Sequence, residues 1–203
     1  MKRIQALASL INPGESVIDI GTDHAYLPIF LYENNITTKV AGSDISSNVL
    51  KYGYQNLAKH NLLEKIELYE SDGFANICGT YDVAVISGMG TTTIKHILNN
   101  HNIPKELIIS THNELPQLRL FMQELGYSIE KEIIVKEKNR YYDIIRYIYE
   151  KEILTEEEIL LGKSNNYEYL EYLYQKYLNI YTKSRQKTYQ DYLAIIEKKL
   201  AKM

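Results

Sequence analysis

The strongest fold signal in the sequence lies in residues 17–26, which read Val-Ile-Asp-Ile-Gly-Thr-Asp-His-Ala-Tyr. A β-branched apolar run ends in a polar bend, and Pro28 follows at a position that suits the first turn of a helix over residues 26–34. Thr22 and Asp23 are residue types that cap helix N-termini. The stretch therefore predicts the first strand-to-helix turn of an α/β sheet, where ligands commonly bind.

The bend contains a single glycine, Gly21, between Asp19 and Asp23. A dinucleotide site needs the pattern Gly-x-Gly-x-x-Gly, because a pyrophosphate lies against bare backbone. Two carboxylates would repel a pyrophosphate, whereas they suit a cationic ligand such as the amino group and sulfonium of S-adenosylmethionine. The charges favour this cofactor; the alternative is a tight turn that carries acids without a binding role.

Composition limits the classes of protein to which the chain can belong. Its 203 residues suit one domain with an appendage, and the net charge of −3 excludes a globally basic nucleic-acid binder. Cys78 is the only cysteine, which excludes an intramolecular disulfide and a cysteine zinc site. We expect no metal, because no spacing of histidines and carboxylates suggests one. No apolar run approaches the ~20 residues of a membrane span, so we expect a soluble, cytoplasmic protein with no membrane association.

The order of apolar runs predicts the topology. Strands that alternate with helices are expected over residues 16–20, 39–43, 66–69, 82–87 and 107–110. Two further strands with no helix between them are expected over 128–136 and 142–149. This layout predicts a Rossmann-like class I methyltransferase fold, an α/β fold with a seven-stranded, mostly parallel sheet and an antiparallel edge strand. We place this domain in residues 1–152 and a C-terminal helical hairpin in 153–203.

Polar and small residues follow the expected strands. Asp44 comes 23 positions after Gly21, a spacing at which a carboxylate can accept both hydroxyls of a ribose. Asp72 and Gly73 follow the third strand, where they would meet an adenine ring. A glycine on each side of Met89 makes a floor for a flat ring or a thioether; the alternative is that Met89 fills a gap in the core.

Two blocks resemble a known family. Residues 19–28 read Asp-Ile-Gly-Thr-Asp-His-Ala-Tyr-Leu-Pro and residues 87–90 read Ser-Gly-Met-Gly. They closely resemble the bacterial tRNA (adenine(22)-N1)-methyltransferase family, with its Asp-Ile-Gly-Ser-Asp-His-Ala-Tyr-Leu-Pro and Gly-Met-Gly-Gly blocks. The resemblance runs from the opening helix through the seventh strand into the helical tail. It implies an S-adenosylmethionine-dependent enzyme that methylates N1 of an adenine in the D-arm region of tRNA.

The resemblance also implies cofactor contacts by position. The methionine part would be surrounded by Asp19, Gly21, Thr22, Asp23 and His24, and the ribose by Asp44 and Ile45. The adenine would contact Asp72 and Gly73, and the inner wall of the pocket would consist of Ser87, Gly88 and Met89. The chain departs from the family at Thr91, where the family has glycine, and at Thr111-His112, where it has Gln-Pro. Both departures lie on the side expected to face the target base.

Methyl transfer to adenine N1 is an in-line displacement, and the neutral base supplies its own lone pair. Positioning and exclusion of water therefore dominate the chemistry. Asn113 is our candidate for holding the exocyclic amine, and with Met89 it forms the candidate catalytic set; the alternative is that Asn113 caps the helix after the fifth strand. The Asn/Asp-Pro-Pro-aromatic motif of amino-directed enzymes is missing after the fourth strand, which favours a ring nitrogen as the target.

Two residues of the first block have alternative interpretations. His24 either contacts the cofactor carboxylate or caps the following helix. Tyr26 either stacks on a base of the substrate or closes the core.

The tail predicts a helical hairpin of coiled-coil type. Residues 155–158 carry a helix N-terminal signature, residues 162–166 break the helix, and tyrosines and leucines then recur at helical spacing in two segments. Lys183, Arg185 and Lys187 lie between these segments. Basic side chains interleaved with tyrosines suit RNA, so we expect these residues to bind tRNA. The alternative is a solvated helix face over a tyrosine core.

Two other functions are consistent with parts of the sequence. A methyltransferase acting on a small molecule or a protein would share the cofactor loop, and a noncatalytic adenosyl-binding module could recruit a partner through the hairpin. The blocks at the first and fourth strands favour the tRNA enzyme. We expect tRNA as the partner and a monomer rather than a homodimer.

Overall fold

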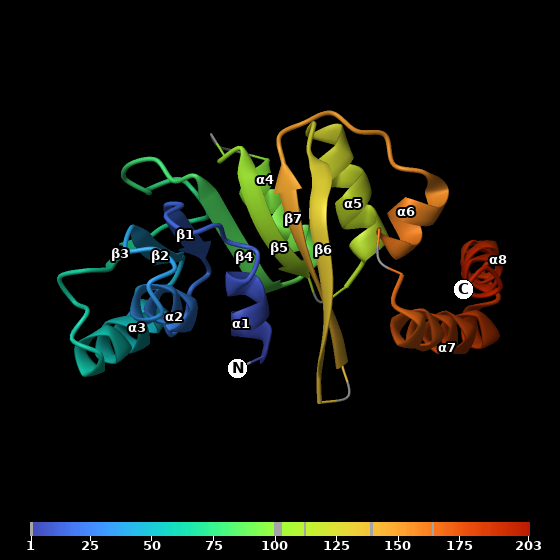
Figure 1. Ribbon diagram of the computed structural model, residues 1–203, viewed down its shortest axis with the longest axis horizontal. Helices are drawn as coiled ribbons and strands as arrows, with labels where there is room; N and C mark the ends of the chain where they lie inside the picture. The colour runs from blue at the N-terminus through green and yellow to red at the C-terminus, as the bar shows by residue number, and fades with distance from the viewer. Residues whose placement is uncertain (1, 100–102, 112, 139, 164) are drawn as a thin grey trace. The chain divides into compact units, whose positions relative to one another are not determined.

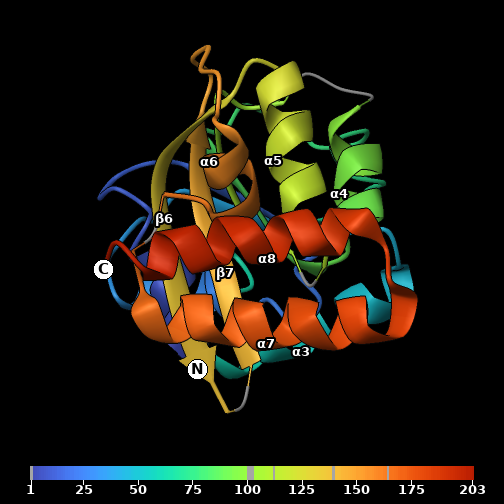
Figure 2. The ribbon, with the colours of Figure 1, turned by 90° about the vertical axis from the view of Figure 1, so that its right-hand side faces the viewer.

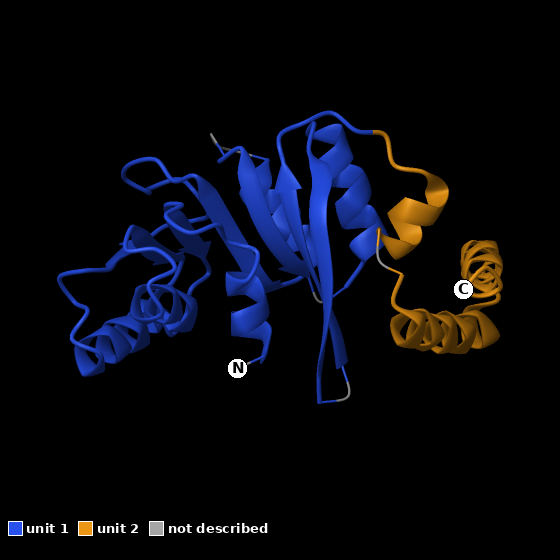
Figure 3. Cartoon of the chain, in the orientation of Figure 1, with its two compact units in different colours: residues 1–152 blue, residues 153–203 orange. Residues whose placement is uncertain are grey.

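The computed structural model describes residues 2–99, 103–111, 113–138, 140–163 and 165–203. The chain forms two compact units, which Figure 3 colours separately. Unit 1 is Met1–Glu152 and holds the sheet, and unit 2 is Ile153–Met203 and is helical.

Unit 1 contains a seven-stranded sheet of order β3-β2-β1-β4-β5-β7-β6 (Figure 1). Its strands are β1 Val17–Ile20, β2 Val40–Asp44, β3 Glu67–Glu70, β4 Val83–Met89, β5 Glu106–Thr111, β6 Ser128–Glu137 and β7 Arg140–Ile148. The strands β1 to β5 pair in parallel, and β7 is antiparallel to both β5 and β6. The register of β6 with β7 shifts between Ile129 and Lys131. The predicted class I methyltransferase fold is confirmed.

Five helices accompany the sheet in the described part of unit 1. They are α1 Lys2–Ala8, α2 Tyr26–Glu33, α3 Ser47–Lys59, α4 Thr91–Leu98 and α5 Leu115–Glu124. Buried residues of α1, α2 and α3 share one apolar core with Val17, Val83 and Val85. Side chains alternate along a strand, so Ala84 and Ile86, which are also fully buried, point to the opposite face. The sheet is therefore covered on both faces, as the unbroken apolar run of β4 predicts.

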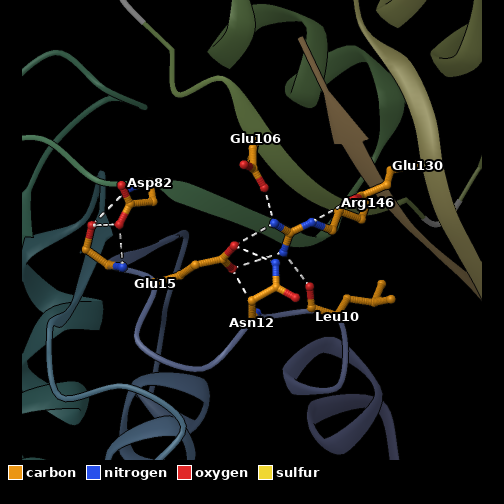
Figure 4. A network of polar contacts seen from close by, with 8 residues as sticks. Leu10, Asn12, Glu15, Asp82, Glu106, Glu130 and Arg146 are labelled. Atoms are coloured by element: carbon orange, nitrogen blue, oxygen red, sulfur yellow. Dashed lines mark hydrogen bonds and ion pairs between the residues drawn. The ribbon is translucent and has the colours of Figure 1, made fainter. Parts of the chain in front are cut away.

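A buried arginine anchors the chain where it enters β1 (Figure 4). Arg146 of β7 is 3% exposed and donates to the carbonyl oxygen of Leu10 at 2.5 Å and to the carboxylate of Glu15 at 2.7 and 3.0 Å. It also pairs with Glu106 and with Glu130. Burial raises the pKa of Glu15, but its hydrogen bonds outweigh that effect and the net shift is downward, so this carboxylate is ionised.

Unit 2 consists of α6 Glu156–Leu161, α7 Tyr167–Ser184 and α8 Lys187–Leu200. Thr155 and Glu158 form a capping box at the start of α6, as the sequence predicts. Helices α7 and α8 lie side by side as a hairpin (Figure 2). Tyr177 of α7 packs against both Tyr189 and Tyr192 of α8, with ring centres 6.0 and 5.2 Å away. The predicted helical hairpin is confirmed.

Candidate functional site

A pocket of about 500 Å³ opens at the carboxyl ends of β1, β2 and β4. Strand pairing explains why these ends converge, since Ile20 lies beside Ser43 on one side and Ile86 on the other. The predicted site residues in its wall are Asp19, Gly21, Thr22, Asp23, His24, Tyr26, Asp44, Ser87, Gly88 and Met89. A pocket of this size suits a cofactor-sized ligand.

Asp19 is a buried carboxylate in this wall. Its side chain accepts a hydrogen bond from the Thr22 hydroxyl at 2.7 Å. Burial raises the pKa of Asp19 to about 7; the Thr22 hydrogen bond opposes this rise and the nearby carboxylate of Asp44 adds to it. A bound cation would stabilise the ionised form of Asp19.

The backbone around Gly21 is held against β2 and β4. Its φ is +74°, and the N–H groups of Gly21 and Thr22 both donate to the carbonyl oxygen of Ser43, at 2.7 and 2.8 Å. The terminal methyl group of Met89 occupies the space that a Cβ of residue 21 would need. Met89 therefore covers the bend at the pocket wall, and its role as a floor for a cofactor stays a prediction.

Helix α2 starts without the side-chain cap predicted at Thr22 or Asp23. The N-cap position is Ala25, with φ +57° and no side-chain cap hydrogen bond. The Thr22 hydroxyl bonds to the Asp19 carboxylate instead, and Asp23 itself adopts a φ of +50°. Capping by His24 is likewise wrong; its imidazole lies 3.6 Å from the Asp23 carboxylate.

Three aromatic rings cluster beside the pocket. The ring of His24 stacks on Tyr26 at a centroid distance of 5.2 Å and lies 5.4 Å from the ring of Tyr52. Both tyrosines are more than half exposed, so Tyr26 does not close the core. Exposed rings of this kind can stack on nucleobases. Sequence reasoning missed Tyr52, which carries no signal of its own within α3.

The ribose candidates differ in their surroundings. The Asp44 carboxylate lines the pocket and accepts the N–H of Ser46 at 3.0 Å, which fixes its orientation. Ile45 is 66% exposed and lies outside the pocket wall.

The adenine candidates also lie outside this wall. The carboxylate of Asp72 is 3.6 Å from the imidazole of His96 on α4, and both side chains are more than half exposed. Gly73, with φ +55°, packs against Ile97 of α4. The structure thus brings together the predicted methionine, ribose and inner-wall residues except Ile45, and places the adenine candidates next to α4.

Asn113 joins the ends of β4 and β5. Its side-chain oxygen accepts the N–H of Thr91 at 3.1 Å, and the Thr91 hydroxyl donates to the Asn113 carbonyl oxygen at 2.7 Å. Asn113 therefore caps α4. The alternative prediction, that Asn113 caps the helix after the fifth strand, is wrong, because that helix, α5, has no side-chain cap. Thr91 is buried and also bonds to Thr111 at 3.1 Å. His112 lies outside the described residues.

Helix α1 contributes to the pocket wall through Arg3, Ile4 and Leu7, which sequence reasoning did not assign to the site. Arg3 is the one lysine or arginine in the described wall. Its signal in the sequence is that of an ordinary amphipathic helix, so only the folded structure reveals its position.

The predicted RNA-contacting residues belong to unit 2. Lys183, Arg185 and Lys187 are exposed at the turn between α7 and α8, and the guanidinium of Arg185 lies 5.8 Å from the ring centre of Tyr181. The described residues contain no cluster of three or more side chains able to hold a metal ion. No helix in the described ranges is long and apolar enough to cross a bilayer.

Comparisons with known proteins agree with this geometry. Residues 1–145 match the model of the methyltransferase-domain family. A Mycoplasma genitalium protein described as a candidate tRNA methyltransferase is 32% identical over 151 residues, covering 71% of this chain and 67% of that protein. The tRNA (adenine(22)-N(1))-methyltransferase of Bacillus subtilis is 28% identical over 149 residues, covering 71% of this chain and 63% of that enzyme. The structure of M. capricolum TrmK with S-adenosyl-homocysteine is 30% identical, with a TM-score of 0.86 and coverage of 99% and 97% of the two chains.

Proposed function

The chain belongs to the methyltransferase-domain family, and from this premise we propose that it methylates N1 of adenine 22 of tRNA with S-adenosylmethionine. The observation that carries the proposal is the pocket with Asp19 and Asp44 at the carboxyl edge of the sheet. It occurs in a chain that aligns over nearly its whole length with TrmK bound to S-adenosyl-homocysteine.

The residues of the pocket fit this cofactor. S-adenosylmethionine supplies an electrophilic methyl group on a sulfonium when it is bound. Asp19 and Asp23 present carboxylates toward its cationic methionine part, and Asp44 offers a fixed acceptor for the ribose hydroxyls. The raised pKa of Asp19 supports this assignment, because a buried carboxylate lacking a cationic partner is stabilised when a cation binds.

The remaining task of the protein is to orient the base and exclude water. His24 and Tyr26 offer a stacking surface beside the pocket, and Met89 covers Gly21 on its inner wall. One lone pair of the Asn113 side-chain oxygen accepts from Thr91. The second can accept from the exocyclic amine of adenine, which would leave N1 facing the methyl group. No general base is required, since neutral adenine N1 already carries a lone pair.

Unit 2 is the proposed tRNA-binding appendage. Its exposed Lys183, Arg185 and Lys187 surround one turn, and Arg185 lies 5.8 Å from the ring centre of Tyr181, which suits contact with phosphates and bases. Because tRNA is the substrate, we place the enzyme in the cytoplasm, and we expect it to act as a monomer.

The deciding experiment is nucleoside analysis of bulk tRNA after reaction with labelled S-adenosylmethionine. We expect 1-methyladenosine at position 22 and nowhere else in the tRNA. Label in another nucleoside, in protein or in a small molecule would overturn the substrate assignment. In calorimetry, Asp44→Ala should weaken cofactor binding by about 1–3 kcal/mol, and Asp72→Ala tests the adenine contact in the same assay.

A further inference from the structure

The β6–β7 hairpin projects past the carboxyl edge of the sheet, the edge at which the pocket opens (Figure 1). Pairing of β5 with β7 ends at Ile109–Ile145, whereas β6 and β7 stay paired as far as Glu137–Arg140. At ~3.3 Å per residue, the extra length of β7 reaches roughly 16 Å beyond its last pair with β5. Because β7 is antiparallel to β5, the turn of the hairpin lies at the same edge of the sheet as the carboxyl end of β4.

Helix α1 connects this hairpin to the pocket wall. Arg3 lines the pocket, and its guanidinium lies 5.3 Å from the ring centre of Tyr142 on β7. Near the turn, the carboxylate of Glu137 accepts a hydrogen bond from the backbone N–H of Lys2. The projecting part of the hairpin is therefore held against the start of the helix that borders the pocket.

The hairpin and the start of α1 together present a basic strip, which comprises Lys2, Arg3, Lys136, Lys138 and Arg140. All of these residues are exposed except Arg3, which is half-buried. Glu137 is the carboxylate among them, whereas the whole chain has a net charge of −3. The register pairs Lys136 with Tyr141 and Glu137 with Arg140, so the alternation of side chains places Lys136 on the opposite face of the hairpin from Arg140, 5.1 Å from the ring centre of Tyr141. The positive charge of the strip therefore covers both faces of the hairpin, and it reaches the pocket wall through Arg3.

We propose that the basic strip binds the phosphate backbone of the RNA strand whose base enters the pocket. The assignment rests on the proposed function and adds RNA contacts within unit 1 to those expected in unit 2. An adenine N1 becomes accessible only when its base leaves the stack, and the backbone on either side must then be held near the pocket. Exposed lysine and arginine side chains serve that purpose without reading sequence.

The test uses the full chain with Lys138→Ala/Arg140→Ala. The matched control is Lys39→Ala/Lys65→Ala, which removes equal charge from exposed lysines just before β2 and β3, at the opposite edge of the sheet. We expect the hairpin variant to bind tRNA roughly tenfold more weakly. The slope of its affinity against salt concentration should be shallower, by the amount that corresponds to the loss of about one to two phosphate contacts. The control should bind tRNA as the wild type does, and S-adenosylmethionine affinity should stay unchanged in both variants.

Unchanged tRNA affinity in the hairpin variant, or an equal loss in the control, would overturn the proposal. Gel retardation without cofactor measures tRNA binding independently of methyl transfer. A wild-type chain that binds tRNA through the strip but methylates none of it would contradict the proposed function alone. A hairpin variant that binds and methylates tRNA normally would contradict the strip alone.

Discussion

The hydroxyl of Thr22 donates a hydrogen bond of 2.7 Å to the carboxylate of Asp19 inside the pocket wall. Burial nevertheless dominates the pKa of Asp19 and raises it to about 7, with a further contribution from Asp44. Asp19 therefore changes its charge near neutral pH, in the wall where the cofactor is proposed to bind.

Asp19→Asn should stabilise the protein in the absence of cofactor. The unfolded chain releases the Asp19 proton near pH 3.8 and the folded chain near pH 7, so the wild type loses stability as the pH rises between these values. The substitution removes that loss and should raise the free energy of unfolding by on the order of 4 kcal/mol above pH 7, with no gain below pH 3.8. Urea unfolding across this pH range measures the effect, and parallel pH profiles for the two proteins would contradict it. Cofactor affinity should fall in the same variant.

Gly21→Ala should damage the site for two reasons. It places a side chain at a φ of +74°, and it collides with the methyl group of Met89. We expect a loss of stability of ~1–2 kcal/mol from the backbone alone, with an added loss of cofactor affinity in calorimetry. Gly14→Ala is the control, since its φ is +88° with open space around the new Cβ. Combining Met89→Ala with Gly21→Ala should recover part of the lost stability, because it removes the colliding methyl group. Equal losses of stability in Gly21→Ala and Gly14→Ala would refute the steric argument.

Removing the charges at the α7–α8 turn should weaken tRNA binding. In Lys183→Ala/Arg185→Ala/Lys187→Ala we expect a lower affinity for tRNA. The slope of this affinity against salt concentration should fall by the amount that corresponds to up to about three phosphate contacts, and cofactor affinity should be unchanged. Lys39→Ala/Lys65→Ala/Lys105→Ala removes the same charge from exposed positions in unit 1 and serves as the control. Filter binding over a salt series measures both. Wild-type affinity in the turn variant would assign these residues to solvation of the hairpin.

Arg146→Met should destabilise unit 1 by about 3 kcal/mol at pH 7, because it leaves the partly buried carboxylate of Glu15 without its cation. The paired Glu15 carboxyl has a lowered pKa, so its contribution is present above its ordinary value of 4.5 and is lost as the pH falls through the lowered value. The loss of stability in Arg146→Met should therefore be smaller in acid than at pH 7. Glu130→Gln, at a carboxylate that is 45% exposed, should cost less than about 1 kcal/mol. Urea unfolding at pH 7 and pH 4 distinguishes these outcomes.

Local signals in the sequence were sufficient for the fold. The β-branched run and the bend after it predicted a strand over 16–20 and a helix from residue 26, and the structure has β1 at Val17–Ile20 and α2 at Tyr26–Glu33. The pocket residues on strand ends were predictable for the same reason, since parallel strands bring their carboxyl ends together.

Features that depend on tertiary contacts were not predictable. Arg3 and Tyr52 reach the site because α1 and α3 pack beside it, which no local pattern reveals. The predicted cap at Thr22 failed because its hydroxyl bonds to Asp19. Asn113 caps α4 because β4 and β5 end next to each other.

The shift in register between Ile129 and Lys131 has a consequence for solubility. Strand β6 is the outer strand at one margin of the sheet, and the shift interrupts its ladder where Glu130 and Lys131 are exposed. The other margin, β3, spans four residues, and Glu67 and Glu70 at its two ends are exposed. Kinks, short length and charge each hinder the addition of a foreign strand. Both margins are thereby poor templates for aggregation of the folded protein.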